Sequence, residues 1–258
     1  MRMSGEHHAQ LVAARKLLES TGLAVKATSV LGKPIEKGFE LLPGDWRQRI
    51  GEVTRDALMV AMKGAVLTMG ARSEVAYPRW HKLAAAVSGA AGGAFGLPAL
   101  IVELPVSTTI MCRSIADIAR AIGESLSDVA TRLACLEVFA LGGTSKSDDA
   151  AETGYFAVRA GLAQAVSEAA QYIATHTAAQ EGAPALVRLV AMIASRFQIQ
   201  VSEKAAAQAV PIIGAAGGAL INLLFIDHFQ DMSRGHFTIR RLERIYGAEE
   251  VRREYERS

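Results

Sequence analysis

The chain has 258 residues, of which 50% are hydrophobic but only 6% aromatic, so its apolar character comes from small and aliphatic side chains. This length and composition allow one or two domains with a sizeable core and exclude a disordered or disulfide-stapled protein. The 28 Lys and Arg against 26 Asp and Glu leave a net charge of +2, which provides no basic excess for nucleic-acid binding. The first residues lack the apolar run of a secretory signal, and we expect a cytoplasmic protein.

Helical patterns fill most of the chain, and no segment alternates apolar and polar residues over the length of a half-buried strand. The first pattern covers about residues 6–20. A second begins at Asp45, a good N-cap residue, and continues to about Gly70. A third runs from Pro105 to Ile122.

Three more helices are expected further along the chain, over about residues 125–142, 150–179 and 184–209. The first of these begins at Ser125, with Asp128 completing a variant capping box. The sequence therefore predicts an all-α fold with one multi-helix domain over 45–247, an N-terminal helical extension over 1–44 and a charged tail over 248–258. Cys112 and Cys135 lie in apolar helical patterns and are expected in the core.

One hexapeptide, Gly-Ala-Ala-Gly-Gly-Ala, occurs twice, at residues 89–94 and 214–219, with an offset of 125 residues. Each copy lies in a run of residues without charge and is followed by an acidic residue and an amphipathic segment. This spacing predicts two related Gly/Ala-rich helical hairpins. Glycines four residues apart flatten a helix face for close packing, or for contact with lipid or a ligand. The glycines concerned are Gly89, Gly92, Gly93, Gly214, Gly217 and Gly218.

The uncharged runs, residues 83–102 and 205–226, raise the question of a membrane. The second run is long enough, at about 1.5 Å per residue, to cover a hydrocarbon core of about 30 Å. It contains Gln208, Pro211 and Asn222, however, and its glycines and alanines favour insertion only weakly. Two alternatives stay open: a soluble or peripheral protein that buries both runs, and insertion into the inner membrane.

No catalytic signature such as HExxH, G-x-S-x-G, CxxC or GxGxxG occurs in the sequence. The best candidate for a ligand or metal site is a set of polar residues in which Asp227 and Asp231 share one helix face. The set consists of Glu103, Asp227, His228, Asp231 and His236. The alternative interpretation is structural, with Glu103 and Asp227 each ending an apolar run and capping the next helix. We assign no catalytic residue, no cofactor and no identified metal from the sequence.

A series of short motifs resembles the EcsC protein family over about residues 80–247. The C-terminal part is carried by Val210-Pro211-Ile212-Ile213-Gly214, His236-Phe237, Arg240-Arg241-Leu242-Glu243 and Tyr246-Gly247. The upstream part is carried by Gly92-Gly93, Glu103-Leu104-Pro105 and the block from Arg132 to Gly142. The resemblance implies a bacterial, mostly helical, cytoplasmic or membrane-associated protein, from a family named for an ABC-transporter locus. It provides no catalytic residues.

Two functions from different classes follow as expectations. The first is a non-catalytic helical protein at the cytoplasmic membrane face, acting as a transporter accessory or a lipid-contacting module, with a membrane surface or membrane protein as its partner. The second is a metal-dependent hydrolase that uses the Asp, His and Glu cluster.

Overall fold

The computed structural model of the chain describes residues 3–20, 35–68, 86, 97–142, 154–176, 183–209 and 214–258. Within these ranges the regular structure is helical and contains no strand, which confirms the all-α fold. The α-helices are α1 (Gly5–Leu18), α3 (Ile35–Leu41), α4 (Trp46–Thr68), α6 (Leu100–Ala121), α7 (Val129–Glu137), α8 (Tyr155–Thr175), α9 (Pro184–Ala209), α10 (Gly214–Tyr246) and α11 (Ala248–Arg257). Two short 3₁₀ turns, η2 (Leu97–Ala99) and η3 (Val138–Ala140), adjoin α6 and α7.

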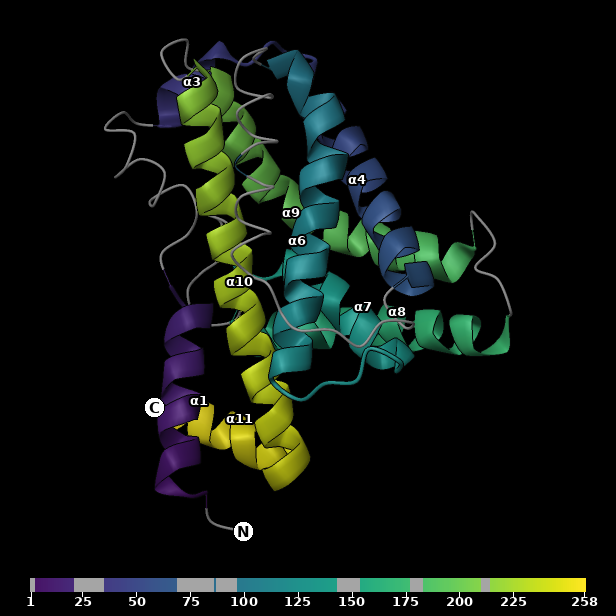
Figure 1. Cartoon of the computed structure of the whole chain (residues 1–258), viewed down its shortest axis with the longest axis vertical. Helices are drawn as coiled ribbons and strands as arrows, with labels where there is room; N and C mark the ends of the chain where they lie inside the picture. The colour runs from purple at the N-terminus through teal and green to yellow at the C-terminus, as the bar shows by residue number, and fades with distance from the viewer. Residues whose placement is uncertain are drawn as a thin grey trace.

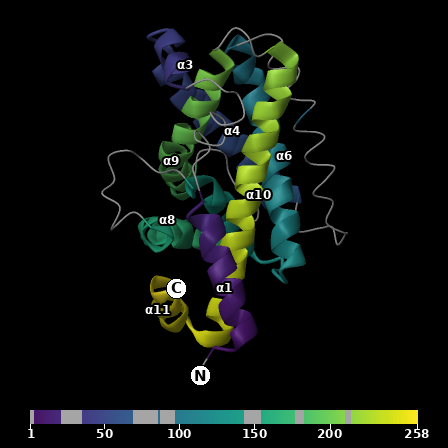
Figure 2. The ribbon, with the colours of Figure 1, turned by 90° about the vertical axis from the view of Figure 1, so that its left-hand side faces the viewer.

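The longest helix, α10, runs along most of the molecule and organises its neighbours (Figure 1). Helix α6 lies beside it, α4 packs on α6 and α9, and α1 lies along the C-terminal half of α10 (Figures 1 and 2). Helix α8 crosses below α9, and α11 turns back after Gly247, whose φ of 89° gives the turn that a glycine adopts without strain. The charged C-terminal segment is thus a helix that packs on α1 and α10 through Val251 and Tyr255.

The few aromatic residues gather at the centre of the core. Phe139 of η3 lies between Phe197 of α9 and Phe229 of α10, with ring centroids 5.0 and 5.1 Å apart, and Phe225 adds a contact to Phe229 at 5.3 Å. All four rings are buried. Such offset and edge-on pairs stabilise beyond the area that they bury. Small aliphatic side chains surround this cluster, which is how a chain poor in aromatics still forms a dense core.

The helix around Ser125 begins later than the sequence predicts. Asp128 is the N-cap of α7, and its carboxylate accepts a hydrogen bond from the N–H of Ala130 at 3.2 Å. Ser125 and Ser127 precede the helix and bond to each other instead. The α-helix also ends at Glu137 and tightens into η3 before Gly142. By contrast, Pro184–Ala209 matches its predicted bounds, because proline fits the first turn of a helix.

The second copy of the repeated hexapeptide opens α10, which continues without interruption to Tyr246. Its glycine-rich and amphipathic parts are therefore one helix, and Asp227 lies inside that helix instead of capping the next one. The first copy, with Gly89, Gly92 and Gly93, lies outside the described residues. The pairing of two related hairpins stays a prediction.

Two other glycines provide close helix contacts that the sequence did not single out. A Cβ added to Gly38 of α3 would lie 1.9 Å from the carbonyl oxygen of Ala206 in α9. A Cβ on Gly235 of α10 would lie 2.6 Å from Cγ of Leu18 in α1. At both crossings the absence of a side chain allows the helices to approach.

Candidate functional site

The two acidic residues predicted on α10 are four residues apart in that helix. Asp227 and Asp231 are both partly buried. Asp231 forms an ion pair with Arg234, one turn further along, with an N–O distance of 3.0 Å. This pair is partly exposed and lies within one helix, so it contributes little to stability.

The two predicted histidines are fully buried and point to different neighbours. The ring of His228 packs so closely on Gly142 that a Cβ there would be 2.6 Å from its Cε1 and Nε2 atoms. His236, two turns later, places Nδ1 3.0 Å from the phenolic oxygen of Tyr155 in α8. In the described part of the chain, no three or more His, Cys, Asp or Glu side chains converge to hold a metal ion. The predicted residues therefore do not form one common site in the described structure.

Glu103 lies in the interior between three helices. One of its carboxylate oxygens is 2.6 Å from Nζ of Lys204 in α9, and the other accepts a hydrogen bond from Nδ2 of Asn222 in α10 at 2.7 Å. The side chains of Lys204 and Glu103 are 0% and 5% exposed. The ammonium group also lies 5.1 Å from the ring centroid of Phe225. This buried pair joins α6, α9 and α10.

The surroundings of Glu103 keep it ionised. Burial by itself would raise the pKa of the carboxyl group, but the positive charge of Lys204 and the hydrogen bonds from Lys204 and Asn222 outweigh it and lower the pKa. Burial lowers the pKa of Lys204, and the neighbouring carboxylate opposes that shift. The two groups therefore stabilise each other as charges, as a buried pair requires.

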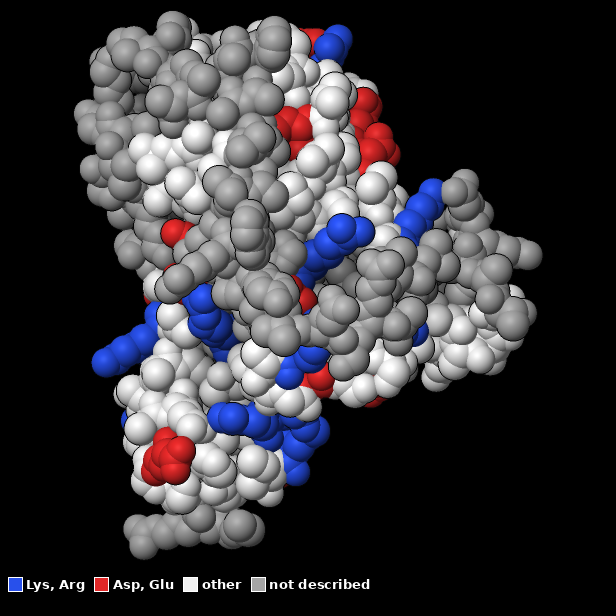
Figure 3. All heavy atoms as spheres, in the orientation of Figure 1, with Lys and Arg blue, Asp and Glu red and all other residues white. Residues whose placement is uncertain are grey.

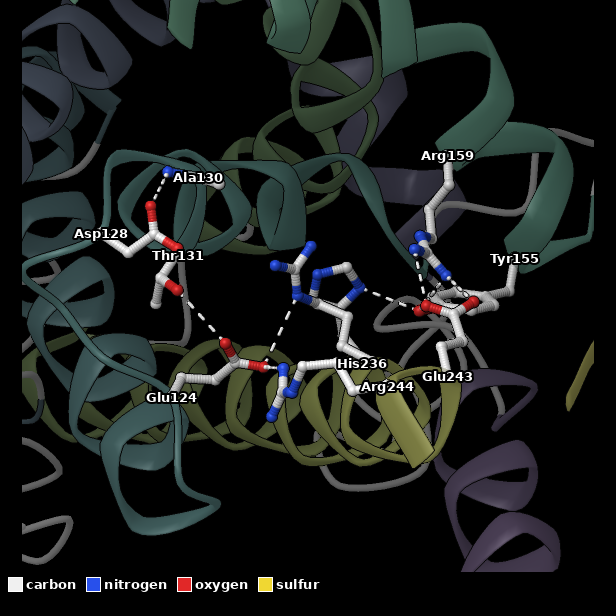
Figure 4. Close-up of polar contacts among 10 residues, drawn as sticks. Glu124, Asp128, Ala130, Thr131, Tyr155, Arg159, His236, Glu243 and Arg244 are labelled. Carbon is white, nitrogen blue, oxygen red and sulfur yellow. Dashed lines mark hydrogen bonds and ion pairs between the residues drawn. The ribbon is translucent and has the colours of Figure 1, made fainter. Parts of the chain in front are cut away.

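A second polar network connects α8 to the C-terminal half of α10 (Figure 4). Arg159 donates two hydrogen bonds to the carboxylate of Glu243, at 2.7 and 3.0 Å, and a further one to the oxygen of Tyr155 at 3.2 Å. Because Arg159 donates to that oxygen, the phenol can donate its own proton to Nδ1 of His236. Nε2 of His236 has no hydrogen-bond partner within the described structure. The network positions α8 on α10.

Burial controls the protonation of this network. It lowers the pKa of His236 well below its usual value, with help from the positive charges of Arg159 and Arg240, so the ring is neutral. Burial also raises the pKa of Tyr155 and of Glu137, a carboxylic acid that is only 7% exposed. Buried groups of this kind, shielded from solvent, support packing more readily than chemistry on a substrate.

Glu124, just after α6, anchors the end of that helix to α7 and α10 (Figure 4). Its carboxylate accepts a hydrogen bond from the hydroxyl of Thr131 at 3.2 Å and from Arg244, while Nε of Arg240 lies 3.7 Å away. The arginines near the C-terminal end of α10 thus have a structural role. Arg241 likewise donates to the side-chain oxygen of Gln10 in α1 at 2.7 Å.

The cysteines are core residues, as predicted. Cys112 and Cys135 are both free and buried. Burial raises the pKa of the Cys112 thiol to about 12 and that of Cys135 well above its usual range. Neither is a reactive thiolate at neutral pH.

The outward face of the first turns of α6 is apolar. Val102 is 73% exposed, and Ile101 and Val106 are 41% and 49% exposed. The single charge in these turns, Glu103, points inward, and the next charged residue on α6 is the exposed Arg113. In Figure 3 most of the Lys and Arg surface lies at mid-height and below, while the described surface of the upper half is mainly white, with a few red patches of Asp and Glu. We refer to Ile101, Val102 and Val106 as the α6 apolar face.

Two described helical segments, Leu97–Ala121 and Pro184–Ala209, are long and apolar enough to cross a membrane. In their most apolar stretches 56% and 44% of the residues are buried inside the bundle, as in core helices of soluble proteins. The two uncharged runs predicted from the sequence extend in part outside the described residues. Length and composition therefore allow membrane contact without requiring a span.

A surface pocket of about 490 Å³ lies where α8 ends and α9 begins. His176 and Tyr172 stack there with ring centroids 4.1 Å apart, and Arg188 lies 3.3 Å from Glu168. None of the predicted site residues lines this pocket. Its groups are exposed or partly exposed, and nothing in its chemistry selects a ligand.

Sequence reasoning missed the partners that explain the buried polar residues. Lys204 and Asn222 are distant from Glu103 along the chain, and Tyr155 and Arg159 are distant from His236. The available signal was a single polar residue inside an apolar stretch, which predicts a buried partner but does not identify it.

The model of the EcsC protein family matches residues 14–242, and so extends toward the N-terminus beyond the motifs found from about residue 80 onward. No curated protein and no solved structure matches the chain. The matched range begins inside α1 and ends near the end of α10. It includes the buried pair, the α6 apolar face and, from the second network, Tyr155, Arg159 and His236. The chain therefore belongs to the EcsC protein family.

Proposed function

We propose that this EcsC-family protein is non-catalytic and binds the cytoplasmic face of a membrane through the α6 apolar face. The observation that carries the proposal is the exposure of three neighbouring aliphatic side chains, led by Val102, on a helix apolar enough for a bilayer. Full burial of such a side chain is worth about 1.5–3 kcal/mol. Contact with lipid would remove these side chains from water, and that burial would stabilise the bound state.

The position of Arg113 on α6 determines how deeply the α6 apolar face would enter the membrane. Val106 and Arg113 are seven residues apart, which is about 10 Å along a helix. Interfacial proteins bury apolar groups about 5–10 Å into the boundary between headgroups and acyl chains. With the α6 apolar face at that depth, the exposed guanidinium of Arg113 would reach the phosphates of anionic lipids.

A lipid partner suits this face better than a protein partner, because the face is small, aliphatic and bordered by one cation. A transporter subunit in the same membrane is the other partner that the family name suggests. The metal-dependent hydrolase is not proposed, because Asp231, His236 and Glu103 are bonded to Arg234, Tyr155 and Lys204.

The test is co-sedimentation of the purified full chain with vesicles of phosphatidylcholine, with and without phosphatidylglycerol. The double variant Val102→Asp and Val106→Asp should lower binding at least about tenfold, because two carboxylates would enter the apolar boundary. Ile245→Asp is the matched control, since Ile245 is 44% exposed near the far end of α10 and should bind like wild type.

Three outcomes would contradict the lipid proposal. They are wild-type protein that binds neither kind of vesicle, equal binding by the double Asp variant, and binding to native membranes that disappears with protein-free vesicles. The last result would point to a membrane protein as the partner.

A further inference from the structure

Glu103 is the single charged residue among the 30 residues from 83 to 112, between Lys82 and Arg113. Without it, this stretch would be uncharged over more than the roughly 20 residues that a transmembrane helix needs. The charge therefore interrupts a stretch that would otherwise be long enough for a membrane span.

The bundle accommodates this charge with a complete set of partners. Nζ of Lys204 lies 2.6 Å away, Nδ2 of Asn222 donates at 2.7 Å, and all three side chains are buried. Lys204 comes from the other helix that is apolar enough to cross a membrane.

Stability alone does not explain why a charged pair occupies this position. A buried ion pair gains little over well-packed apolar side chains of the same volume, because desolvation offsets the attraction. Two aliphatic residues would hold α6 and α9 together about as well. The charges at this position therefore have a role other than holding α6 and α9 together.

A charge at this position has a large effect on whether the helix enters a lipid bilayer. A carboxylate near the centre of a helix lowers its partition into the membrane by roughly a hundredfold. In the folded bundle the same carboxylate is neutralised by Lys204. The charge thus penalises the inserted state and leaves the bundle nearly unaffected.

We propose that the Glu103–Lys204 pair selects the bundle over membrane insertion, so that the apolar start of α6 stays packed in the bundle with α9 and α10 and does not become part of a span. The inference goes beyond the proposed lipid contact. It holds equally for a protein that never touches a membrane, because it concerns which of two folds the stretch adopts.

The test uses the full chain expressed in bacterial cells, followed by carbonate washing of the membranes. Glu103→Met combined with Lys204→Met removes both charges and keeps the volume. Its carbonate-resistant fraction should rise by roughly a hundredfold over that of wild type, limited by complete insertion. Arg159→Met combined with Glu243→Met is the matched control. It removes a partly buried pair outside the apolar stretch and should be extracted like wild type.

A second pair of variants separates insertion from misfolding. The exchange Glu103→Lys with Lys204→Glu keeps a charge in the stretch and should be extracted by carbonate. Glu103→Gln retains an acceptor for Asn222 while removing the charge, and should be more carbonate-resistant than the exchange variant. Circular dichroism of the extracted proteins reports whether they are helical.

Two results would overturn the inference. The first is wild-type protein that already resists carbonate. The second is complete extraction of both the double Met variant and Glu103→Gln. Loss of vesicle binding by wild type would refute the lipid proposal and leave this comparison unaffected.

Discussion

The phenolic oxygen of Tyr155 lies 3.0 Å from Nδ1 of His236, so a tyrosine at the first residue of α8 closes over a histidine in the interior of α10. Both residues are buried. Tyr155→Phe would leave Nδ1 without its partner and should lower the free energy of unfolding by about 1–3 kcal/mol. Urea denaturation measures the change.

The matched control is Tyr246→Phe. The Tyr246 hydroxyl bonds to Nδ1 of His7 at 2.9 Å near the surface, where water can replace it. We expect a loss below about 1 kcal/mol there. If both substitutions lowered the free energy of unfolding equally, burial of the Tyr155–His236 hydrogen bond would not increase its contribution to stability.

His236 should make the protein less stable in mild acid. Its pKa in the folded state lies below the unfolded value of about 6.5, so between these values the unfolded chain binds a proton that the folded chain excludes. This contribution is present above pH 6.5 and is lost as the pH falls through that window, with a slope of at most about 1.4 kcal/mol per pH unit. The slope of unfolding free energy against pH should be flatter in His236→Phe. Parallel curves for both proteins would contradict the assignment.

Glu137 should act with the opposite sign. Burial raises its pKa above the ordinary 4.5, so its contribution is fully present below that pH and is lost as the pH rises through the folded-state pKa. Glu137→Gln, which cannot ionise, should therefore gain stability relative to wild type as the pH rises above 4.5. Urea unfolding at several pH values measures the difference. The surface variant Glu249→Gln is the control and should stay parallel to wild type. A constant difference for Glu137→Gln would refute the interpretation.

Gly142 should tolerate a side chain less well than Gly123, although both have positive φ angles, of 75° and 96°. Alanine at either position strains the backbone by about 1–2 kcal/mol. At Gly142 the new Cβ would also lie 2.6 Å from the ring of His228 and 2.8 Å from Sδ of Met232, whereas the space around Gly123 is open. We expect Gly142→Ala to destabilise by at least about 1 kcal/mol more. Thermal melts of the two variants compare them, and equal melting temperatures would contradict the packing argument.

Sequence periodicity predicted the helices well because their ends carry local chemistry. Pro184 marks the start of α9 as expected. Asp128, expected inside a capping box, is itself the cap of α7. Ser125 and Asp128 are both suitable N-cap residues, and the sequence around them does not show which one begins the helix. Glu124 also accepts a hydrogen bond from Thr131 of α7, a contact that no capping signal predicts.

The candidate site could be predicted only as a set of unusual residues. Glu103, His228 and His236 each interrupt an apolar pattern, and each is buried with a specific neighbour. Helical spacing places residues on a face but does not say which helix meets that face. The partner of Glu103 is 101 residues away at Lys204, so the pair depends on how α6 and α9 pack.

The close-packing role that the sequence assigned to glycines can be measured at Gly38. A Cβ at this position would meet backbone atoms of Ala206, which cannot move aside as a flexible side chain would. Gly38→Ala must therefore separate α3 from α9, and we expect a loss of about 1–3 kcal/mol. Gly161→Ala is the control, because Gly161 lies in α8 with open space around it. There alanine should stabilise the helix by about 0.5–1 kcal/mol. Urea denaturation of both variants gives two changes of opposite sign. If alanine raised the free energy of unfolding at both positions, α3 would be able to shift on α9 without destabilising the protein. Gly38 would then not be required for the close approach of these helices.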